Sequence, residues 1–81
     1  MLKIVYSRLA LQALRRMPAA VIRRIRERID SYARSPALAA DVVKLKGREG
    51  YRLRVGGYRV IFRRDSDRLS ILDIGPRGDI Y

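Results

Sequence analysis

Residues 51–62 read YRLRVGGYRVIF, which is two runs rich in β-branched and aromatic residues joined by a Gly-Gly pair. This pattern is typical of a β-hairpin closed by a two-residue turn of type I′ or II′. Such a turn sets the register, so Val55 is predicted to lie opposite Tyr58 and Arg54 opposite Arg59. Because side chains alternate between the two faces of a strand, one face is predicted to enter the core: Tyr51, Leu53, Val55, Tyr58, Val60 and Phe62. The opposite face then carries Arg52, Arg54, Arg59, Ile61 and Arg63.

The arginine-rich face of this hairpin carries an electrostatic cost. Like charges directly opposite each other on an antiparallel pair are destabilising by about 0.2–1 kcal/mol. No acidic residue lies between Tyr51 and Arg64 to offset the Arg54–Arg59 pair. One interpretation is that the arginines splay into solvent. The other is that their guanidinium groups line a concave anion site, because their paired N–H donors match phosphate oxygens. The hairpin by itself leaves both interpretations open.

The composition of the whole chain favours a polyanionic partner. Its 81 residues suffice for one small domain, and they carry a net charge of +11 at pH 7. Nucleic acid is the first candidate for such a partner; an anionic membrane surface or an acidic protein is the alternative. The absence of cysteine and histidine excludes a disulfide scaffold, a Cys/His metal site and the usual acid–base residue. No apolar run is long enough for a membrane span, and the first residues do not fit a signal peptide.

Two helices are predicted before the hairpin. Residues 2–6 are expected to form a short strand, and Ser7 is a suitable N-cap for the helix that follows. A second helix is predicted over residues 19–33, because apolar residues recur there on one helical face: Ile22, Ile25, Ile29 and Tyr32. Its outer face mixes arginines with Glu27 and Asp30 at three- or four-residue spacing. Part of that face is therefore expected to be exposed to solvent and to contain ion pairs between these residues.

The remaining segments predict a small α+β domain. Residues 42–45 are expected to pair briefly with the sheet, and residues 69–74 form a strand that is apolar on both faces and therefore interior. The order β-α-α-β-β-β then places two helices on one face of a small antiparallel sheet. If residues 69–74 pair beside the hairpin, the turn after them delivers the C-terminal residues to one end of the sheet. Four guanidinium groups would then line one cleft: those of Arg52, Arg54, Arg59 and Arg77.

Three segments and their order resemble a known family. They are the KLKG segment at 44–47, the hairpin, and the closing G-x-R-x-x-x-Y pattern of Gly75, Arg77 and Tyr81. Over essentially the whole chain they resemble the RelE/ParE toxins of bacterial and archaeal toxin–antitoxin pairs. The basic hairpin and the Arg…Tyr ending are more similar to RelE-type members, which cut messenger RNA in the ribosomal A site.

The resemblance implies specific roles for basic residues. Arg59 matches the hairpin arginine expected to hold the scissile phosphate, and Arg77 and Tyr81 match the arginine and tyrosine of the closing motif. The other implied contacts to phosphate and RNA are Arg52, Arg54, Lys44 and Lys46. Arginine cannot act as a base and the chain has no histidine, so Tyr81, its pKa lowered by guanidinium groups, is the candidate base. The resemblance implies neither a metal nor a cofactor.

The same resemblance implies partners and leaves alternatives. The expected partners are messenger RNA on the ribosome and a small antitoxin, partly acidic, that folds as it binds and forms a hetero-oligomer with this chain. A cytoplasmic location and no membrane partner are expected. Many relatives carry a histidine or lysine where Pro76 stands and a basic residue where Gly78 stands. That departure motivates two alternatives: a ParE-like toxin that inhibits DNA gyrase, and a degenerate toxin that only binds its antitoxin.

Overall fold

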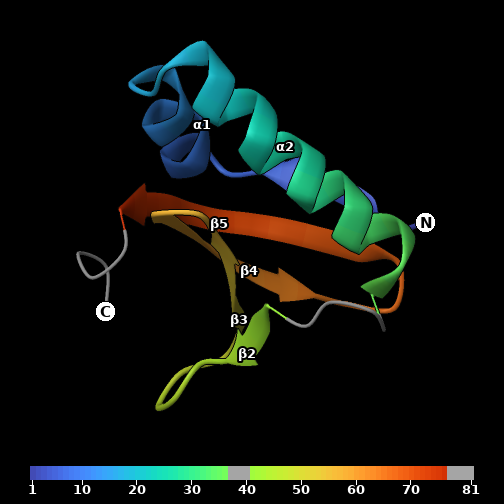
Figure 1. The fold of residues 1–81 in the computed structure, drawn as a ribbon. Coiled ribbons are helices and arrows are strands. Elements are labelled where there is room, and N and C mark those ends of the chain that lie inside the picture. The colour runs from blue at the N-terminus through green and yellow to red at the C-terminus, as the bar shows by residue number, and fades with distance from the viewer. Residues whose placement is uncertain (37–40, 77–81) are drawn as a thin grey trace.

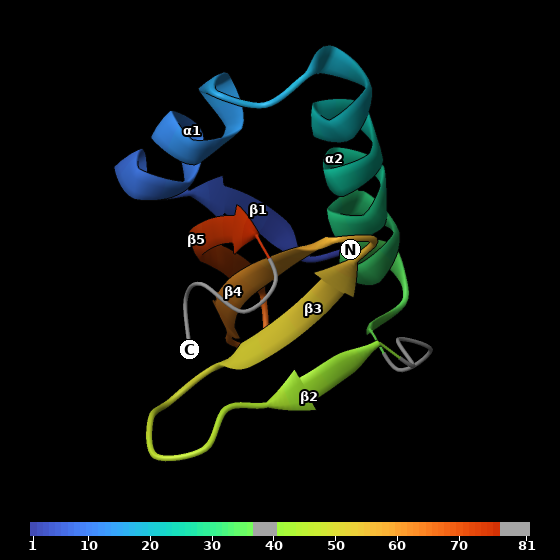
Figure 2. The same ribbon diagram turned by 60° about the vertical axis from the view of Figure 1, so that its left-hand side comes forward.

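The fold is a five-stranded sheet with two helices on one face, seen in a computed structural model that describes residues 1–36 and 41–76 (Figure 1). The strand order is β1-β5-β4-β3-β2. Both helices lie on the same side of the sheet in both views (Figure 2). In chain order the elements are β1 (Lys3–Tyr6), α1 (Arg8–Arg15), α2 (Ala19–Arg34), β2 (Val42–Lys44), β3 (Tyr51–Val55), β4 (Tyr58–Arg64) and β5 (Arg68–Pro76).

This arrangement confirms the predicted α+β plan. The short strand expected near residues 42–45 is present as β2 at one edge of the sheet, and β5 is interior, between β1 and β4. The pairs β2–β3, β3–β4 and β4–β5 are antiparallel. β1, however, pairs with β5 in parallel, so the sheet is mixed and not wholly antiparallel. Both helices follow β1 in the sequence and precede the other four strands. They form the long crossover connection that parallel pairing requires.

The first helix begins at a side-chain cap. Ser7 has extended backbone, and its Oγ accepts a hydrogen bond from the backbone N–H of Ala10 at 3.0 Å, as predicted for an N-cap. The same Oγ donates to the carbonyl of Leu72 at 2.7 Å. One hydroxyl therefore caps α1 and attaches it to β5.

Strand β5 contains an irregularity that accounts for its apolar sequence. Ile61 and Phe62 are consecutive, but their partners on β5 are Asp73 and Ile71, so Leu72 is an extra residue in the ladder. Such a bulge shifts the alternation of side chains by one. Ile71 and Ile74 therefore both reach the core, although their spacing of three would place them on opposite faces of a regular strand.

The core lies between the helices and the sheet. α2 contributes a buried stripe at helical spacing, and β3 and β4 contribute the residues that the hairpin pattern predicted. β5 adds Leu69, Ile71 and Ile74. Phe62 is at its centre, with its ring centroid 5.2 Å from that of Tyr32 and 5.6 Å from that of Tyr51. Tyr51 and Tyr58 are only partly buried at the margin of this core.

The outer face of α2 lacks, within the described residues, the ion pairs that the sequence predicted for it. Glu27 and Asp30 form no ion pair with any arginine of this helix in the described chain. The ion pair that α2 does form is Arg28–Asp41 at 2.9 Å, which joins the helix to the residue before β2. The other ion pair in the described residues, Arg63–Glu49 at 4.0 Å, joins β4 to the β2–β3 loop. Exposed i,i+4 pairs contribute only a few tenths of a kcal/mol, too little to hold long side chains in one geometry. No helix in the described residues has the length and apolar character that crossing a membrane requires.

Candidate anion-binding site

The turn of the β3–β4 hairpin fixes the register of the arginine face. Gly56 has φ +58°, and Gly57 is not in the left-handed region. This combination fits a type II′ turn, in which only the first central residue needs positive φ, and not type I′. The predicted register is confirmed: Val55 pairs with Tyr58, and Arg54 pairs with Arg59. Arg52, Arg54 and Arg59 therefore share the outer face, which points away from the helices.

Arg59 is buried on this outer face, which the sequence did not indicate. Only 7% of the residue is exposed, and its outer-face neighbour Ile61 is fully buried. The Nε of Arg59 has no hydrogen-bond partner among the described residues, and neither does the buried Nε of Arg52. Leaving a buried donor unsatisfied costs about 1–3 kcal/mol, and more for a charged group. An anion that accepted these N–H bonds would remove that cost.

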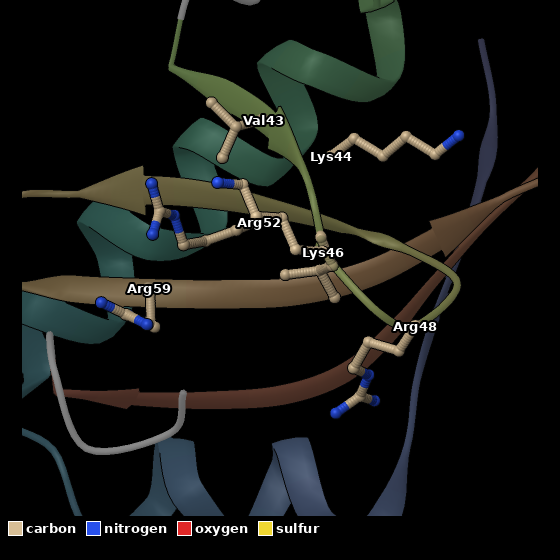
Figure 3. Close-up of a pocket in the computed structure, with 7 residues that line it drawn as sticks. Val43, Lys44, Lys46, Arg48, Arg52 and Arg59 are labelled. Atoms are coloured by element: carbon tan, nitrogen blue, oxygen red, sulfur yellow. The ribbon is translucent and has the colours of Figure 1, made fainter.

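Arg52 and Arg59 both line one cavity of about 330 Å³ (Figure 3). In the close-up their side chains extend in the same direction from the neighbouring strands β3 and β4. The cavity is bounded by β2 and by the loop between β2 and β3, and its lining residues are Val43, Lys44, Leu45, Lys46, Arg48, Arg52 and Arg59. Five of these seven are cationic, and no carboxylate is among them. Such a concave cationic surface concentrates positive potential and favours anions.

The loop that carries Lys46 and Arg48 depends on two glycines. Gly47 has φ +75° and Gly50 has φ +125°. At Gly50, a Cβ would come within 3.0 Å of the carbonyl oxygen of Phe62. The loop is closed by a hydrogen bond from the N–H of Leu45 to the carbonyl of Gly50 at 3.0 Å. These constraints fold the loop back, so that the residues after β2 contribute to the cavity wall.

A second, smaller cavity lies beside the first. Its volume is about 240 Å³, and it is lined by Asp41, Val43, Arg52 and Arg54. Arg52 and Val43 line both cavities, and they are register partners across β2 and β3. The described arginines of the predicted cleft are therefore divided: Arg59 lines the first cavity, Arg54 the second, and Arg52 both.

The other predicted site residues lie in different places. Lys46 lines the first cavity. Lys44 also borders it, but it pairs with Tyr51 and so belongs to the opposite face of the sheet by alternation. Its side chain is exposed and extends away from Arg52 and Arg59 (Figure 3). Arg77 and Tyr81 lie outside the described residues, so the fourth guanidinium of the predicted cleft and the candidate base are not placed.

Sequence reasoning missed several wall residues of these cavities. Val43 is 45% exposed on the outer face, and its position follows from the register of β2, which no turn signal fixes. Arg48 lies within the basic loop KLKGREG, and its charge was the available signal. Asp41 precedes β2 and is paired with Arg28. No group of three or more potential metal ligands occurs in the described residues.

Comparison with known proteins places the chain in a family. A sequence model described as "ParE toxin of type II toxin-antitoxin system, parDE" matches residues 4–81. No curated protein sequence matches the chain significantly. Among solved structures, the archaeal RelE–RelB complex from Pyrococcus horikoshii OT3 contains a chain 32% identical to this one, with a TM-score of 0.82 and coverage of 96% of this chain and 97% of that chain.

Two further solved structures show the same fold. The RelB–RelE antitoxin–toxin complex from Methanococcus jannaschii matches with 26% identity and a TM-score of 0.76, covering 95% of this chain and 94% of that chain. The RelBE2 toxin–antitoxin complex from Mycobacterium tuberculosis matches with 21% identity and a TM-score of 0.80, covering 94% and 98%. The family match over nearly the whole sequence, together with this fold, shows that the chain belongs to the RelE/ParE family and is a toxin of a type II toxin–antitoxin system.

Proposed function

We propose that this toxin is a ribosome-dependent endoribonuclease that cleaves messenger RNA. One observation carries the proposal: Arg59 is buried beside a cation-lined cavity, and its Nε has no partner in the described chain. A buried cation without a partner lowers the stability of the fold. A bound anion would supply the missing partner and so would explain why a buried arginine is present at this position. The phosphate of an RNA backbone is such a ligand, and guanidinium groups bind it through paired N–H donors.

The chemistry would use the RNA's own 2′-OH as the nucleophile. The 2′ oxygen attacks the adjacent phosphorus and gives its proton to a base. The bond from phosphorus to the 5′ oxygen of the next nucleotide breaks, and that oxygen takes up a proton. The products are a 2′,3′-cyclic phosphate and a 5′-OH. Arg59 and Arg52 would stabilise the negative charge of the phosphorane, the role that other nucleases give to metal ions.

Proton transfer is the weaker part of this machinery. Tyr81 is the proposed base and Arg77 a further phosphate contact, both from the sequence resemblance. A phenol ordinarily titrates near pH 10, and nearby guanidinium groups would lower its pKa. A toxin with so few acid–base groups must gain most of its rate from orientation of the RNA. Dependence on the ribosome, which holds the codon in a fixed conformation, follows from that need.

The test uses ribosomes programmed with a defined message. We expect cuts in the A-site codon, with a cyclic phosphate on the upstream fragment. Arg59→Gln should abolish cleavage. Arg63→Gln should retain it, because Arg63 is an exposed arginine of the same strand that lines neither cavity. Intact message in the presence of the natural protein, or equal cleavage by Arg59→Gln, would overturn the proposal.

A second candidate function is inhibition of DNA gyrase. It is favoured by one observation, that the matching family model is the one described for ParE toxins. A supercoiling assay run with the same preparations distinguishes the two. Inhibition of supercoiling together with intact message would support the gyrase target, whereas cleaved message with normal supercoiling would exclude it.

We further propose that a small antitoxin neutralises this chain. The solved relatives from Pyrococcus horikoshii and Methanococcus jannaschii are complexes of RelE with RelB, and the net charge of +11 favours an acidic segment that folds as it binds. Calorimetry with the product of the adjacent gene should give tight binding with a negative heat-capacity change. Absence of binding would contradict this part of the proposal.

A further inference from the structure

The two cavities of the outer face are adjacent and share two lining residues. Val43 and Arg52 line both, while Arg59 is confined to the first cavity and Arg54 and Asp41 to the second. A phosphate bound at Arg59 would therefore lie next to the second cavity, because Arg59 pairs across the strands with Arg54, which lines that cavity. A single strand of RNA that passes over Val43 and Arg52 would bring a neighbouring nucleotide into that second cavity.

Asp41 is the one carboxylate that lines either cavity in the described chain. Its Oδ2 accepts a hydrogen bond from Nη2 of Arg28 at 2.9 Å, which ties it to α2. It is not paired with Arg52 or Arg54, the arginines of its own cavity, and its side chain is 57% exposed. Its Oδ1 accepts no hydrogen bond from the described residues. The carboxylate is thus oriented by one partner and open to another.

A carboxylate that lines an RNA-binding cavity repels the RNA phosphates. Its presence is therefore unexpected unless it accepts a hydrogen bond from a donor on the RNA. The phosphates of RNA offer none, but the bases do. Ionised Asp accepts hydrogen bonds only, and single-stranded RNA is recognised largely through the Watson–Crick edges of splayed bases. Val43, with 45% of its surface exposed, supplies an apolar wall against which the face of a base can pack.

From this placement we infer that Asp41 is a specificity-determining residue that reads the base of the nucleotide next to the bound phosphate and selects guanine. Guanine presents N1–H and N2–H side by side, which match the two oxygens of a carboxylate. Adenine and cytosine present one amino group each. Uracil presents a single N–H between two carbonyl oxygens, which the carboxylate repels. The expected order of preference is guanine, then adenine and cytosine, then uracil.

Arg28 acts in this proposal as a positioning residue for Asp41. Its hydrogen bond fixes the carboxylate, and its charge offsets the repulsion between Asp41 and the RNA phosphates. The proposal rests on the proposed function, since it takes single-stranded RNA as the occupant and a phosphate at Arg59 as the anchor. It adds the assignment of a base contact to one residue.

The test measures binding of 2′-O-methyl pentanucleotides, whose blocked 2′ oxygen prevents cleavage. One oligomer is all uridine; in the others guanosine, adenosine or cytidine replaces one uridine, at each position in turn. For the natural chain, guanosine at one position should bind about tenfold more tightly than uridine. Asp41→Asn should reduce that preference to less than about threefold, and Arg28→Gln to an intermediate value. Arg23→Gln, which removes an exposed charge from the same helix, should keep it.

The outcomes separate the two proposals. If every oligomer binds alike but Arg59→Gln abolishes binding, the assignment of Asp41 is overturned and the phosphate site stands. Retention of the guanosine preference by Asp41→Asn has the same meaning. If no oligomer binds at millimolar concentration, or Arg59→Gln binds as well as the natural chain, the assignment of Asp41 is overturned because its phosphate anchor is missing. Cleavage on programmed ribosomes then decides the proposed function separately. Thermal unfolding of each variant confirms that a lost preference is not a lost fold.

Discussion

Arg54 and Arg59 face each other across the β3–β4 hairpin, yet only Arg59 is buried. Arg54 is exposed and borders the smaller cavity, whereas Arg59 lies beside the larger one with its Nε unsatisfied in the described chain. Both share a face without a carboxylate on β3 or β4. The pair costs the hairpin stability, and the burial of one member adds to that cost. The proposed anion-binding site would offset both costs.

Replacement of Arg59 by an apolar residue of similar length should stabilise the fold. Arg59→Met removes a buried guanidinium whose Nε has no hydrogen-bond partner among residues 1–36 and 41–76, and we expect the free energy of unfolding to rise by about 1–3 kcal/mol. The change is measured by urea denaturation in phosphate-free buffer. Arg54→Met is the matched control, since it relieves only the cross-strand repulsion and should change stability by less than about 1 kcal/mol. A strongly destabilised Arg59→Met would show that the guanidinium is structurally satisfied.

The hairpin turn should tolerate a methyl group at one glycine and not at the other. Gly56 has φ +58°, and a Cβ there would come within 3.0 Å of Nη1 of Arg24. That contact involves the flexible end of a side chain, so the backbone strain dominates, and Gly56→Ala should cost about 1–2 kcal/mol. Gly57→Ala, whose Cβ would meet nothing within 4 Å, should cost less than about 0.5 kcal/mol. Chemical denaturation compares the two, and equal costs would contradict the type II′ assignment.

Loss of the Ser7 hydroxyl should destabilise the attachment of α1 to the sheet. Ser7→Ala removes the cap of the Ala10 N–H and the hydrogen bond to the Leu72 carbonyl at the bulge of β5. We expect a cost of about 1–2 kcal/mol. Ser66→Ala, at an exposed turn position, should be nearly neutral. Amide hydrogen exchange should locate the loss of protection in the first turn of α1, and uniform loss across the domain would contradict a local role.

The stability of the fold should fall at alkaline pH partly through Tyr6. Burial raises the pKa of its phenol above the ordinary 10.0; Asp30 adds to the rise, and the Arg26 guanidinium opposes it. Because the unfolded chain ionises at lower pH than the folded chain, this stabilising contribution is complete below pH 10 and is lost as pH rises through the folded-state pKa. Tyr6→Phe should therefore lose less stability than the natural chain between neutral pH and pH about 11. Parallel pH profiles for the two proteins would refute this role.

The part of the fold that local signals determine could be predicted from the sequence. A Gly-Gly pair between two β-rich runs fixes a turn, and the turn fixes every cross-strand pair from Val55–Tyr58 to Tyr51–Phe62. The cap at Ser7 and the apolar stripe of α2 are likewise local. These features confirm the α+β plan and the outward placement of Arg52, Arg54 and Arg59.

Features set by tertiary contacts could not be predicted in this way. The parallel pairing of β1 with β5 depends on how the helices return the chain to the sheet. The face that Lys44 occupies depends on the register of β2, which no tight turn fixes. The burial of Arg59 depends on what surrounds the outer face, and its neighbours from β2 are distant in sequence. Alternation along a strand shows which face a residue occupies but not whether that face is solvated.

The most direct test of the account observes the Arg59 guanidinium itself. In a nitrogen-15 NMR titration with a 2′-O-methyl pentanucleotide, the Nε–H resonance of Arg59 should move strongly and exchange more slowly with water, because a phosphate oxygen accepts its hydrogen bond. The Nε–H of exposed Arg63 should change little. If the RNA binds and the Arg59 signal stays where it was in the free protein, the buried guanidinium does not hold the phosphate, and the central claim is contradicted.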